Sequence, residues 1–318
     1  MDKHEISYLI IIFIIMGSYN MSLTLNCKVN KEPYYAQLIE QGYKYLGQGY
    51  MHVVFEKDGI VYKVVRSKFR NFDKKFDYEF EKNMLDMLRK HNLPTPNVIK
   101  IYDKGNLLKD FYVLSEEKIP GIIKNKETLT VDDVNEIISI REKANAITFP
   151  FFGQLYDKKL QFKTWQEYMM YLIERAKKAA LLFKLDFDAQ EVKNYFSKHY
   201  VYKGAPCFLL LDPNEENFVF DEHGKVAGLI DIDHPMCFDP LYEYAICLYA
   251  KKYIFNMMRK IKKYYINNNI EIIKKYAIVH SLADILFLYD KDKSFFSKEI
   301  EHCAKYVAEF HNFLQDYR

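Results

Sequence analysis

Strand-like and helical patterns occupy separate parts of this chain of 318 residues, and this separation limits the folds that the chain can adopt. Between residues 43 and 118, short apolar runs alternate with turn residues, as where Lys57-Asp58-Gly59 precedes the apolar run at residues 60–65. From residue 131 onward, apolar residues recur mostly at three- and four-residue spacing, which is typical of helices. This order predicts an α+β fold with a small β-rich lobe followed by a larger, mostly helical lobe.

The individual elements follow from the same patterns. Strands are expected at residues 52–55, 60–65, 98–102 and 111–115, with three short strand-like pieces between residues 207 and 233. Helices are expected at residues 72–89, 131–147, 164–185, 240–265, 270–289 and 297–317. Lys251 and the basic residues that follow it as far as Lys263 are expected to form a solvated face of the helix at 240–265, with a docking surface for an acidic partner as the alternative.

Polar side chains follow or precede apolar strands in the segment 207–233. Asp212 ends the run at residues 208–211, Asn217 comes five residues later, and Asp231 lies fourteen residues beyond Asn217. Carboxylate and amide oxygens next to core strands need a partner or a metal. Phosphoryl transfer requires a base that orients a hydroxyl and oxygen ligands for Mg²⁺. We therefore predict Asp212 as the base and Asn217 and Asp231 as metal ligands, with an acidic surface turn as the alternative.

A phosphate-binding site is predicted in the β-rich lobe. Gly47 and Gly49 lie at a turn, where the absence of side chains would let the backbone approach a phosphate. Lys63 lies within an apolar strand and could hold phosphates while paired with a helix carboxylate, for which Glu81 is better placed than Glu79. Each residue also has an ordinary structural explanation: turn glycines, a lysine snorkelling at a sheet edge, and a solvated helix face.

The chain resembles the aminoglycoside phosphotransferase and choline kinase family, which shares the protein-kinase fold. Four blocks carry the resemblance in order: Gly47-Gln48-Gly49 with Val61-Tyr62-Lys63; Glu81 with Leu85, Leu88 and Pro94; Glu117-Lys118-Ile119-Pro120-Gly121; and Asp212 through Pro240. The last block contains the family's catalytic Asp, then Asn, then Ile-Asp, then Asp-Pro. The chain departs from the family at Leu210-Leu211, where His-Gly usually precedes the catalytic Asp.

The resemblance implies a bilobed protein-kinase-like fold. Residues 21–118 would form the N-terminal nucleotide-binding lobe and residues 119–318 the C-terminal catalytic and substrate lobe. The implied reaction moves the γ-phosphate of ATP or GTP, with Mg²⁺, to a hydroxyl of a small molecule such as an aminoglycoside, an amino alcohol or a sugar. Lys63 with Glu81 would secure the phosphates, and residues 114–118, which include Glu117, would contact the adenine. Asp212, Asn217, Asp231 and Lys63 are expected to converge.

Two other functions remain open at this stage: a kinase that acts on protein, and an inactive kinase-fold binding module. An Ala-Pro-Glu signature does not follow Asp231, and Asp239-Pro240 comes too soon for a long peptide-docking loop. Loss of His-Gly is the one feature that supports the inactive module. The acceptor is not identified. A set of acidic residues could line a pocket for a cationic acceptor or be surface charges: Asp284, Asp290, Asp292 and Glu299.

Composition restricts the partners and the compartment. The net charge of +3 argues against a nucleic-acid binder. Five scattered cysteines without a Cys-x-x-Cys pair argue against a disulfide framework or a zinc site and favour the cytoplasm. The apolar run at residues 6–16 is shorter than the about 20 residues that span a bilayer as a helix, so any membrane association is expected only there. Residues 1–20 are interpreted as a signal or anchor, or as sequence upstream of a true start at Met21, with a buried strand as a further alternative. The oligomeric state is not predicted.

Overall fold

The computed structural model describes residues 32–49, 51–67, 74–212, 214–232, 235–292 and 297–317, and the chain forms two compact units. The β-rich unit contains the described residues up to Leu129 together with Glu215–Ile232. The helical unit contains Thr130–Asn214 and the described residues from 235 onward. The apolar run at 6–16 lies outside the described residues, within which no helix is long and apolar enough to cross a membrane.

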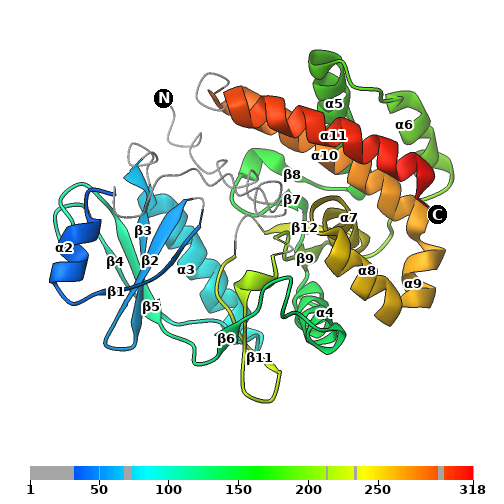
Figure 1. Cartoon of the computed structure of the whole chain (residues 1–318). Helices are drawn as coiled ribbons and strands as arrows, with labels where there is room; N and C mark the ends of the chain where they lie inside the picture. The colour runs from blue at the N-terminus through cyan, green and yellow to red at the C-terminus, as the bar shows by residue number, and fades with distance from the viewer. Residues whose placement is uncertain are drawn as a thin grey trace. The chain divides into compact units, whose positions relative to one another are not determined.

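The β-rich unit is built on a five-stranded antiparallel sheet with strand order β1-β2-β3-β5-β4 (Figure 1). Its strands and its two helices are β1 (Lys44–Gln48), β2 (His52–Lys57), β3 (Ile60–Val65), β4 (Val98–Tyr102), β5 (Val113–Glu117), α2 (Tyr35–Glu40) and α3 (Lys74–Lys90). Asp58 and Gly59 both have positive φ, as a two-residue hairpin requires, and they join β2 to β3. The predicted strands are confirmed, although β5 starts two residues later than expected.

A second sheet brings the segment Glu215–Ile232 into the same unit. Its order is β11-β10-β6, with β6 (Ile122–Ile123), β10 (Phe218–Phe220) and β11 (Val226–Leu229), and a 3₁₀ turn, η4 (Glu215–Asn217), precedes β10. Gly121 has φ +143°, and a Cβ there would lie 2.4 Å from the Phe220 carbonyl oxygen, so the close approach of β6 to β10 requires glycine. This sheet therefore places Asn217 and Asp231 in the unit that contains Lys63.

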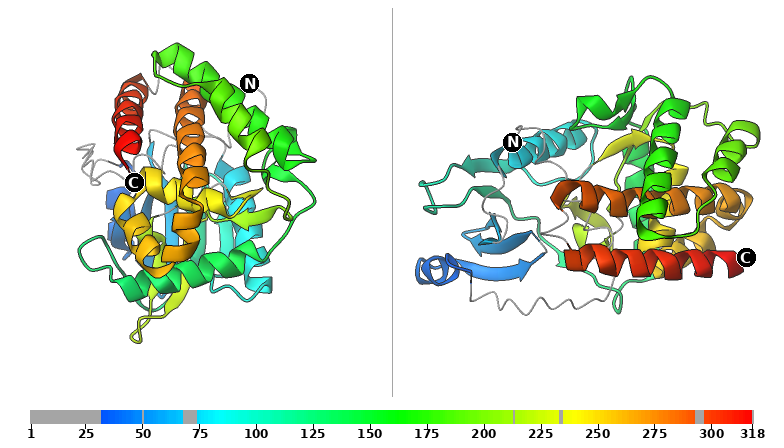
Figure 2. Two further views of the ribbon diagram at one scale, coloured as in Figure 1. Left: turned by 90° about the vertical axis from the view of Figure 1, so that its right-hand side faces the viewer. Right: turned by 90° about the horizontal axis from the view of Figure 1, so that it is seen from above.

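The helical unit combines eight described helices with a four-stranded sheet of order β8-β7-β12-β9. The helices are α4 (Val131–Asn145), α5 (Trp165–Phe183), α6 (Ala189–Lys198), α7 (Leu241–Ala250), α8 (Lys252–Ile261), α9 (Lys263–Asn268), α10 (Ile270–Asp292) and α11 (Ser297–Asp316). The strands are β7 (Phe152–Gln154), β8 (Gln161–Phe162), which follows the turn η3 (Lys158–Leu160), β9 (Cys207–Leu209) and β12 (Met236–Phe238). Helix α10 packs against α5, α7 and α11 (Figure 2).

Capping residues explain where two of these helices begin. Thr130 and Thr164 each accept a hydrogen bond from the backbone three residues later and form capping boxes with Asp133 and Glu167. Helix α6 was not predicted. The predicted single helix at residues 240–265 is wrong, because the backbone leaves the helical region at Lys251 (φ −134°, ψ 64°). The apolar spacing continues across this break without glycine or proline, so periodicity alone does not reveal it.

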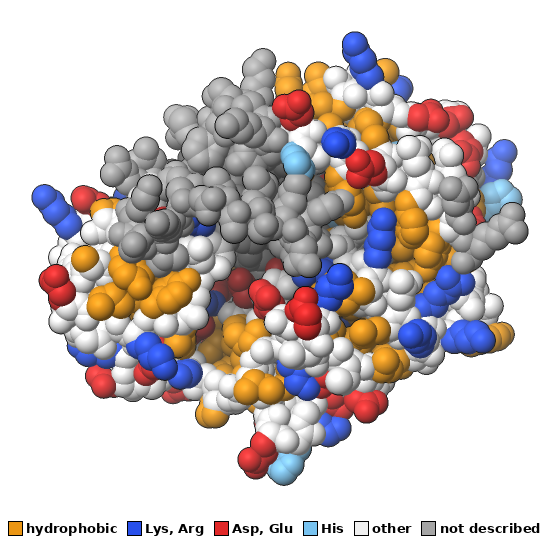
Figure 3. Space-filling view, viewed as in Figure 1, with side chains coloured by type: hydrophobic (Ala, Val, Ile, Leu, Met, Phe, Trp, Pro, Cys, Tyr) orange, Lys and Arg blue, Asp and Glu red, His pale blue; other side chains and the backbone are white. Residues whose placement is uncertain are grey.

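The core of the helical unit is rich in aromatic rings. Trp165 stacks on Phe238 and donates a hydrogen bond from Nε1 to the Tyr276 hydroxyl at 3.0 Å. Among the described cysteines, Cys237, Cys247 and Cys303 are buried, and Cys207 is partly exposed. On the surface, acidic and basic side chains are intermixed over the face seen in Figure 3, in keeping with the small net charge.

Candidate active site

Lys63 lies in the middle of β3 and is buried, with a relative exposure of 7%. Its Nζ donates hydrogen bonds to Glu81 Oε1 of α3 and to the Ile230 carbonyl, both at 2.7 Å. The Glu116 carboxylate of β5 lies 3.3 Å from the same nitrogen. The predicted pairing of Lys63 with Glu81 is therefore present, and the alternative of a lysine snorkelling to solvent is wrong. Whether this pair binds phosphates stays a prediction.

Negative charge exceeds positive charge around Lys63. Burial opposes the charged ammonium, but Glu116, Glu81 and Asp231 together outweigh it and raise the pKa of Lys63 well above 10.5. Burial also raises the pKa of Glu116, and Glu81 and Asp231 raise it further, although Lys63 opposes them. The Oε2 atom of Glu116 is buried and accepts no hydrogen bond. Three carboxylates act on one ammonium, so this site has an excess of negative charge, which an added proton or cation would reduce.

The predicted metal ligands lie on adjoining backbone in the β-rich unit. Asn217 ends η4 and is buried, and its carbonyl accepts a hydrogen bond from the Ile230 amide at 3.0 Å, next to Asp231. Amide and carboxylate oxygens beside an excess of negative charge are a donor set that fits Mg²⁺. In the part of the chain that the structure describes, no cluster of three or more His, Cys, Asp or Glu could hold a metal. Mg²⁺ commonly binds through one or two carboxylates together with phosphates, so two protein ligands suit it.

Gly47 lies within β1, Gly49 lies between β1 and β2, and Glu117 is the last residue of β5. Gly47 follows a bulge in β1, and the Gly49 amide donates to the His52 carbonyl at 2.9 Å. Neither glycine has positive φ, and an added Cβ would meet nothing within 4 Å, so the fold itself does not require glycine there. Glu117 is exposed, and its amide donates to the Asn97 carbonyl at 2.9 Å. Because that amide is engaged, a nucleotide base would bind a carbonyl or another amide of the segment, and this contact stays a prediction.

Asp212 belongs to the helical unit and follows β9. Its Oδ1 accepts a hydrogen bond from the Asn214 amide at 2.9 Å, which fixes a local turn. Leu210 and Leu211, which replace the family's His-Gly, are both buried with relative exposures of 5%. Asp212 and the predicted metal ligands lie in different compact units, so their convergence stays a prediction.

Several residues around the Asp212 loop were missed by sequence reasoning. Arg141 of α4 donates to the carbonyls of Leu210 and Asp212, and Glu243 of α7 accepts from the Leu210 amide. A charged residue on an otherwise buried helix face is the signal that could have found Arg141 and Glu243. Lys251 is also buried and donates to Asn214 Oδ1 at 3.2 Å, so the expectation that it belongs to a solvated face is wrong.

Two buried aspartates of the helical unit have different surroundings. Asp239 accepts hydrogen bonds from the hydroxyls of Tyr200 and Tyr276 and from the Leu241 amide, and so joins the start of α7 to α10. Asp284 is buried, both of its carboxylate oxygens lack a hydrogen-bond partner, and burial raises its pKa well above 3.8. It is therefore not a surface charge. The side chains of Asp290, Asp292 and Glu299 lie outside the described residues.

Replacing Glu116 by Gln is expected to stabilise the protein at alkaline pH. Folding raises the pKa of this carboxyl from 4.5 to about 7, so the folded state resists its ionisation. The resulting loss of stability develops as pH rises from 4.5 to 7 and is fully present above 7. E116Q should match the wild type near pH 5 and exceed it by about 1–3 kcal/mol in unfolding free energy at pH 8.5. Urea denaturation at the two pH values measures this difference, with the exposed neighbour E117Q as the control. An equal difference at both pH values would contradict the assignment.

Comparison with known proteins assigns the chain to a family. The sequence model described as "Phosphotransferase enzyme family" matches residues 63–257, which is more than half of the chain. A search of curated proteins finds no match. This stretch contains all of the predicted site residues except Gly47 and Gly49.

Three solved structures illustrate the likeness in fold. A thermostable mutant of aminoglycoside phosphotransferase APH(4)-Ia, in a ternary complex with AMP-PNP and hygromycin B, is 15% identical with a TM-score of 0.54, covering 85% of this chain and 96% of that one. The streptomycin-ATP-APH(2")-IIa ternary complex is 17% identical with a TM-score of 0.52, covering 89% and 98%. Choline kinase LicA from Streptococcus pneumoniae is 14% identical with a TM-score of 0.51, covering 86% and 97%. The expected α+β, protein-kinase-like fold is confirmed, and the chain belongs to the phosphotransferase enzyme family.

Proposed function

We propose that this protein transfers the γ-phosphate of ATP or GTP to a hydroxyl group of a small molecule, with Mg²⁺ as cofactor. The observation that carries the proposal is the buried Lys63 ammonium, held by Glu81 and by the carbonyl of Ile230, the residue before Asp231. Two fixed acceptors orient this ammonium, so little reorganisation is needed when a phosphate binds. In a chain of the phosphotransferase enzyme family, such a lysine suits a triphosphate.

Each site residue then has a role in positioning or in neutralising charge. Lys63 contacts the phosphates, and Gly47 and Gly49 let the backbone approach them. Asn217 and Asp231 hold Mg²⁺, which when bound neutralises charge on the phosphates. Asp212 orients the acceptor hydroxyl and takes its proton, and the backbone near Glu117 contacts the base of the nucleotide. Catalysis comes from this positioning, without a covalent intermediate.

The acceptor class follows from the relatives and stays broad. The fold neighbours include proteins solved with hygromycin B and with streptomycin, and a choline kinase. We propose an aminoglycoside, an amino alcohol or a sugar as the acceptor, not a nucleic acid, and a cytoplasmic location. The lobe boundary after residue 118 belongs to the same proposal. Membrane association is proposed only through residues 6–16.

Nucleotide binding and acceptor-stimulated turnover test the proposal. Mg-ATP or Mg-GTP at 100 times its Kd should stabilise the folded state by about 2.7 kcal/mol and raise Tm. Release of ADP or GDP should then increase when the correct aminoglycoside, amino alcohol or sugar is added from a panel. A peptide library serves as a parallel arm. A shift in Tm without stimulation by any acceptor would favour the inactive binding module, and stimulation by peptides alone would favour the protein kinase.

A further inference from the structure

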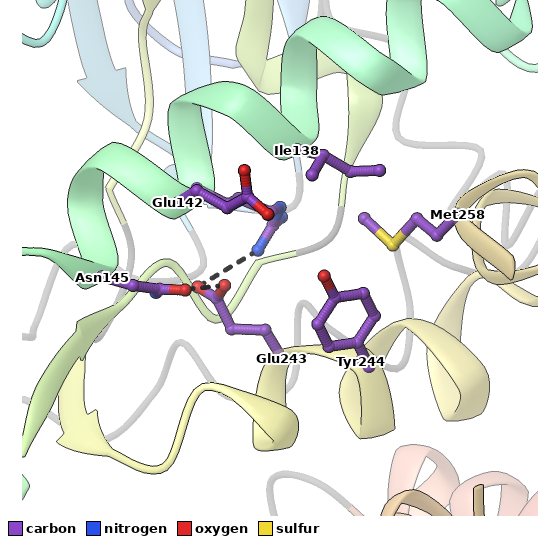
Figure 4. Close-up of a pocket in the computed structure, with 7 residues that line it drawn as sticks. Ile138, Glu142, Asn145, Glu243, Tyr244 and Met258 are labelled. Carbon is purple, nitrogen blue, oxygen red and sulfur yellow. Dashed lines mark hydrogen bonds and ion pairs between the residues drawn. The ribbon is translucent and has the colours of Figure 1, made fainter. Parts of the chain in front are cut away.

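A buried arginine lies beside the loop that carries Asp212. Arg141 is on the inner face of α4, at helical spacing from the buried Ile137, Ile138 and Ala144, and is only 4% exposed. A buried guanidinium without partners would strongly destabilise the fold, so the groups that Arg141 contacts must compensate its charge. Together with Glu243 and Asn145 it lines a small pocket between α4, α7 and α8 (Figure 4).

The guanidinium spans one residue of the loop. Its Nη1 donates to the Leu210 carbonyl, and its Nη2 donates to the Asp212 carbonyl at 2.7 Å. The two nitrogens belong to one rigid, planar group, so they fix the two carbonyls relative to each other. The backbone on both sides of Leu211 is thereby held, and with it the direction in which the Asp212 side chain leaves the chain.

Glu243 holds the arginine and the loop together. Its Oε1 accepts from the Leu210 amide and lies 3.4 Å from Arg141 Nη1, while its Oε2 accepts from Asn145 Nδ2 at 3.3 Å. Asn145 also donates to the Phe208 carbonyl at 2.9 Å. Three side chains from α4 and α7 therefore bind the backbone from residue 208 to residue 212. Leu210 and Leu211 cannot provide such bonds, because their side chains are apolar and packed in the core.

We propose that Arg141, held by Glu243, is a positioning residue that sets the orientation of Asp212 for phosphoryl transfer. This role rests on the proposed function. Arg141 acts through Asp212 and not on the nucleotide. The polar support that a His-Gly pair would give from within the loop comes here from side chains of α4 and α7. Misplacing a catalytic group by about 1 Å can reduce the rate by about 10²-fold, which sets the size of effect to expect.

The variant Arg141→Lys tests this role because it keeps the positive charge beside Glu243 but loses the rigid pair of nitrogens that donate to the two carbonyls. We expect kcat to fall by about 10–100-fold with the nucleotide KM unchanged within about twofold. The exposed Lys143 of the same helix provides the matched control, Lys143→Met, which should retain wild-type kcat. A merely structural role would raise KM and lower kcat together, or would leave kcat unchanged.

A double-variant cycle separates positioning from general damage. If Arg141 acts through Asp212, Arg141→Lys should lower the residual rate by less than about twofold when Asp212 is already Asn. The same loss in both backgrounds would overturn the proposal. If Arg141→Lys does not fold, Glu243→Gln replaces it. The Gln side-chain oxygen can still accept the hydrogen bond from the Leu210 amide, but the negative charge that orients Arg141 is removed. Wild-type kcat in that variant would also overturn the proposal. A wild-type protein without acceptor-stimulated turnover would instead reject the proposed function, and this role with it.

Discussion

Replacing Asp212 by Asn should reduce kcat by about 10³-fold and leave the nucleotide Kd within about twofold of the wild-type value. Asn cannot accept the hydroxyl proton, but its side-chain oxygen can still accept the Asn214 amide, so the turn is kept. The bond from Arg141 goes to the Asp212 main-chain carbonyl and is also kept. Lys63, Glu81 and Asp231 are untouched. Steady-state kinetics with the identified acceptor and calorimetric titration with Mg-nucleotide measure the two quantities.

The control for this prediction is a carboxylate with the same local geometry. Asp221 accepts the amides of His223 and Lys225 at 2.9 and 2.8 Å in the hairpin between β10 and β11. D221N should therefore show the effect of changing a turn aspartate without loss of a base, and its kcat should equal that of the wild type. If D212N also turned over at the wild-type rate, Asp212 would not be the base.

Replacing Lys63 by Met should weaken both folding and nucleotide binding. Removing one partner from a buried ion pair typically destabilises a protein by about 3–5 kcal/mol, and here Glu81, Glu116 and Asp231 would lose their shared cation. Loss of a hydrogen bond to a charged group, worth about 1.5–3 kcal/mol, should raise the nucleotide Kd by about 10–100-fold. Urea denaturation and nucleotide titration test the two parts separately.

A second substitution separates these two effects. Adding Glu116→Gln to Lys63→Met removes one of the unpaired carboxylates, so part of the lost stability should return while the nucleotide Kd stays weak. Lys57 of β2, which donates to the Gln41 carbonyl at 2.8 Å and is more exposed, supplies the control variant Lys57→Met. Normal nucleotide affinity in Lys63→Met would remove Lys63 from the phosphate site.

Local patterns predicted much of the fold because the relevant interactions are local. The turn Asp58-Gly59 and the alternation in β2 and β3 fix a hairpin between neighbours in the sequence. The pairing of Lys63 with Glu81 was also predicted, because Glu81 lies on α3, the next described element along the chain after β3. Arg141 and Glu243 lie 102 residues apart in the sequence, and no local pattern connects them, so their contact required the tertiary structure.

The contact of Glu116 with Lys63 was not predicted, because it depends on which face of the sheet each residue of β5 occupies. In the β3–β5 ladder, Lys63 lies opposite Leu114 and Val61 lies opposite Glu116. Residues two apart share a face of a sheet, so Glu116 lies on the face of Lys63, and Glu117 on the other. The register of β5 against β3 decides this, and it is a long-range property that the sequence of β5 alone does not contain.

The β-rich unit is made of two segments that are separate in the sequence, and this limits how it could be produced as a fragment. A fragment that stopped at residue 129 would lack β10 and β11, and would leave β6 without its partner strand and Lys63 without the Ile230 carbonyl. Cleavage between residues 129 and 130 likewise would not release the unit as one peptide. To express the β-rich unit alone, the segment that ends at Leu129 would have to be joined to Glu215–Ile232 in one chain.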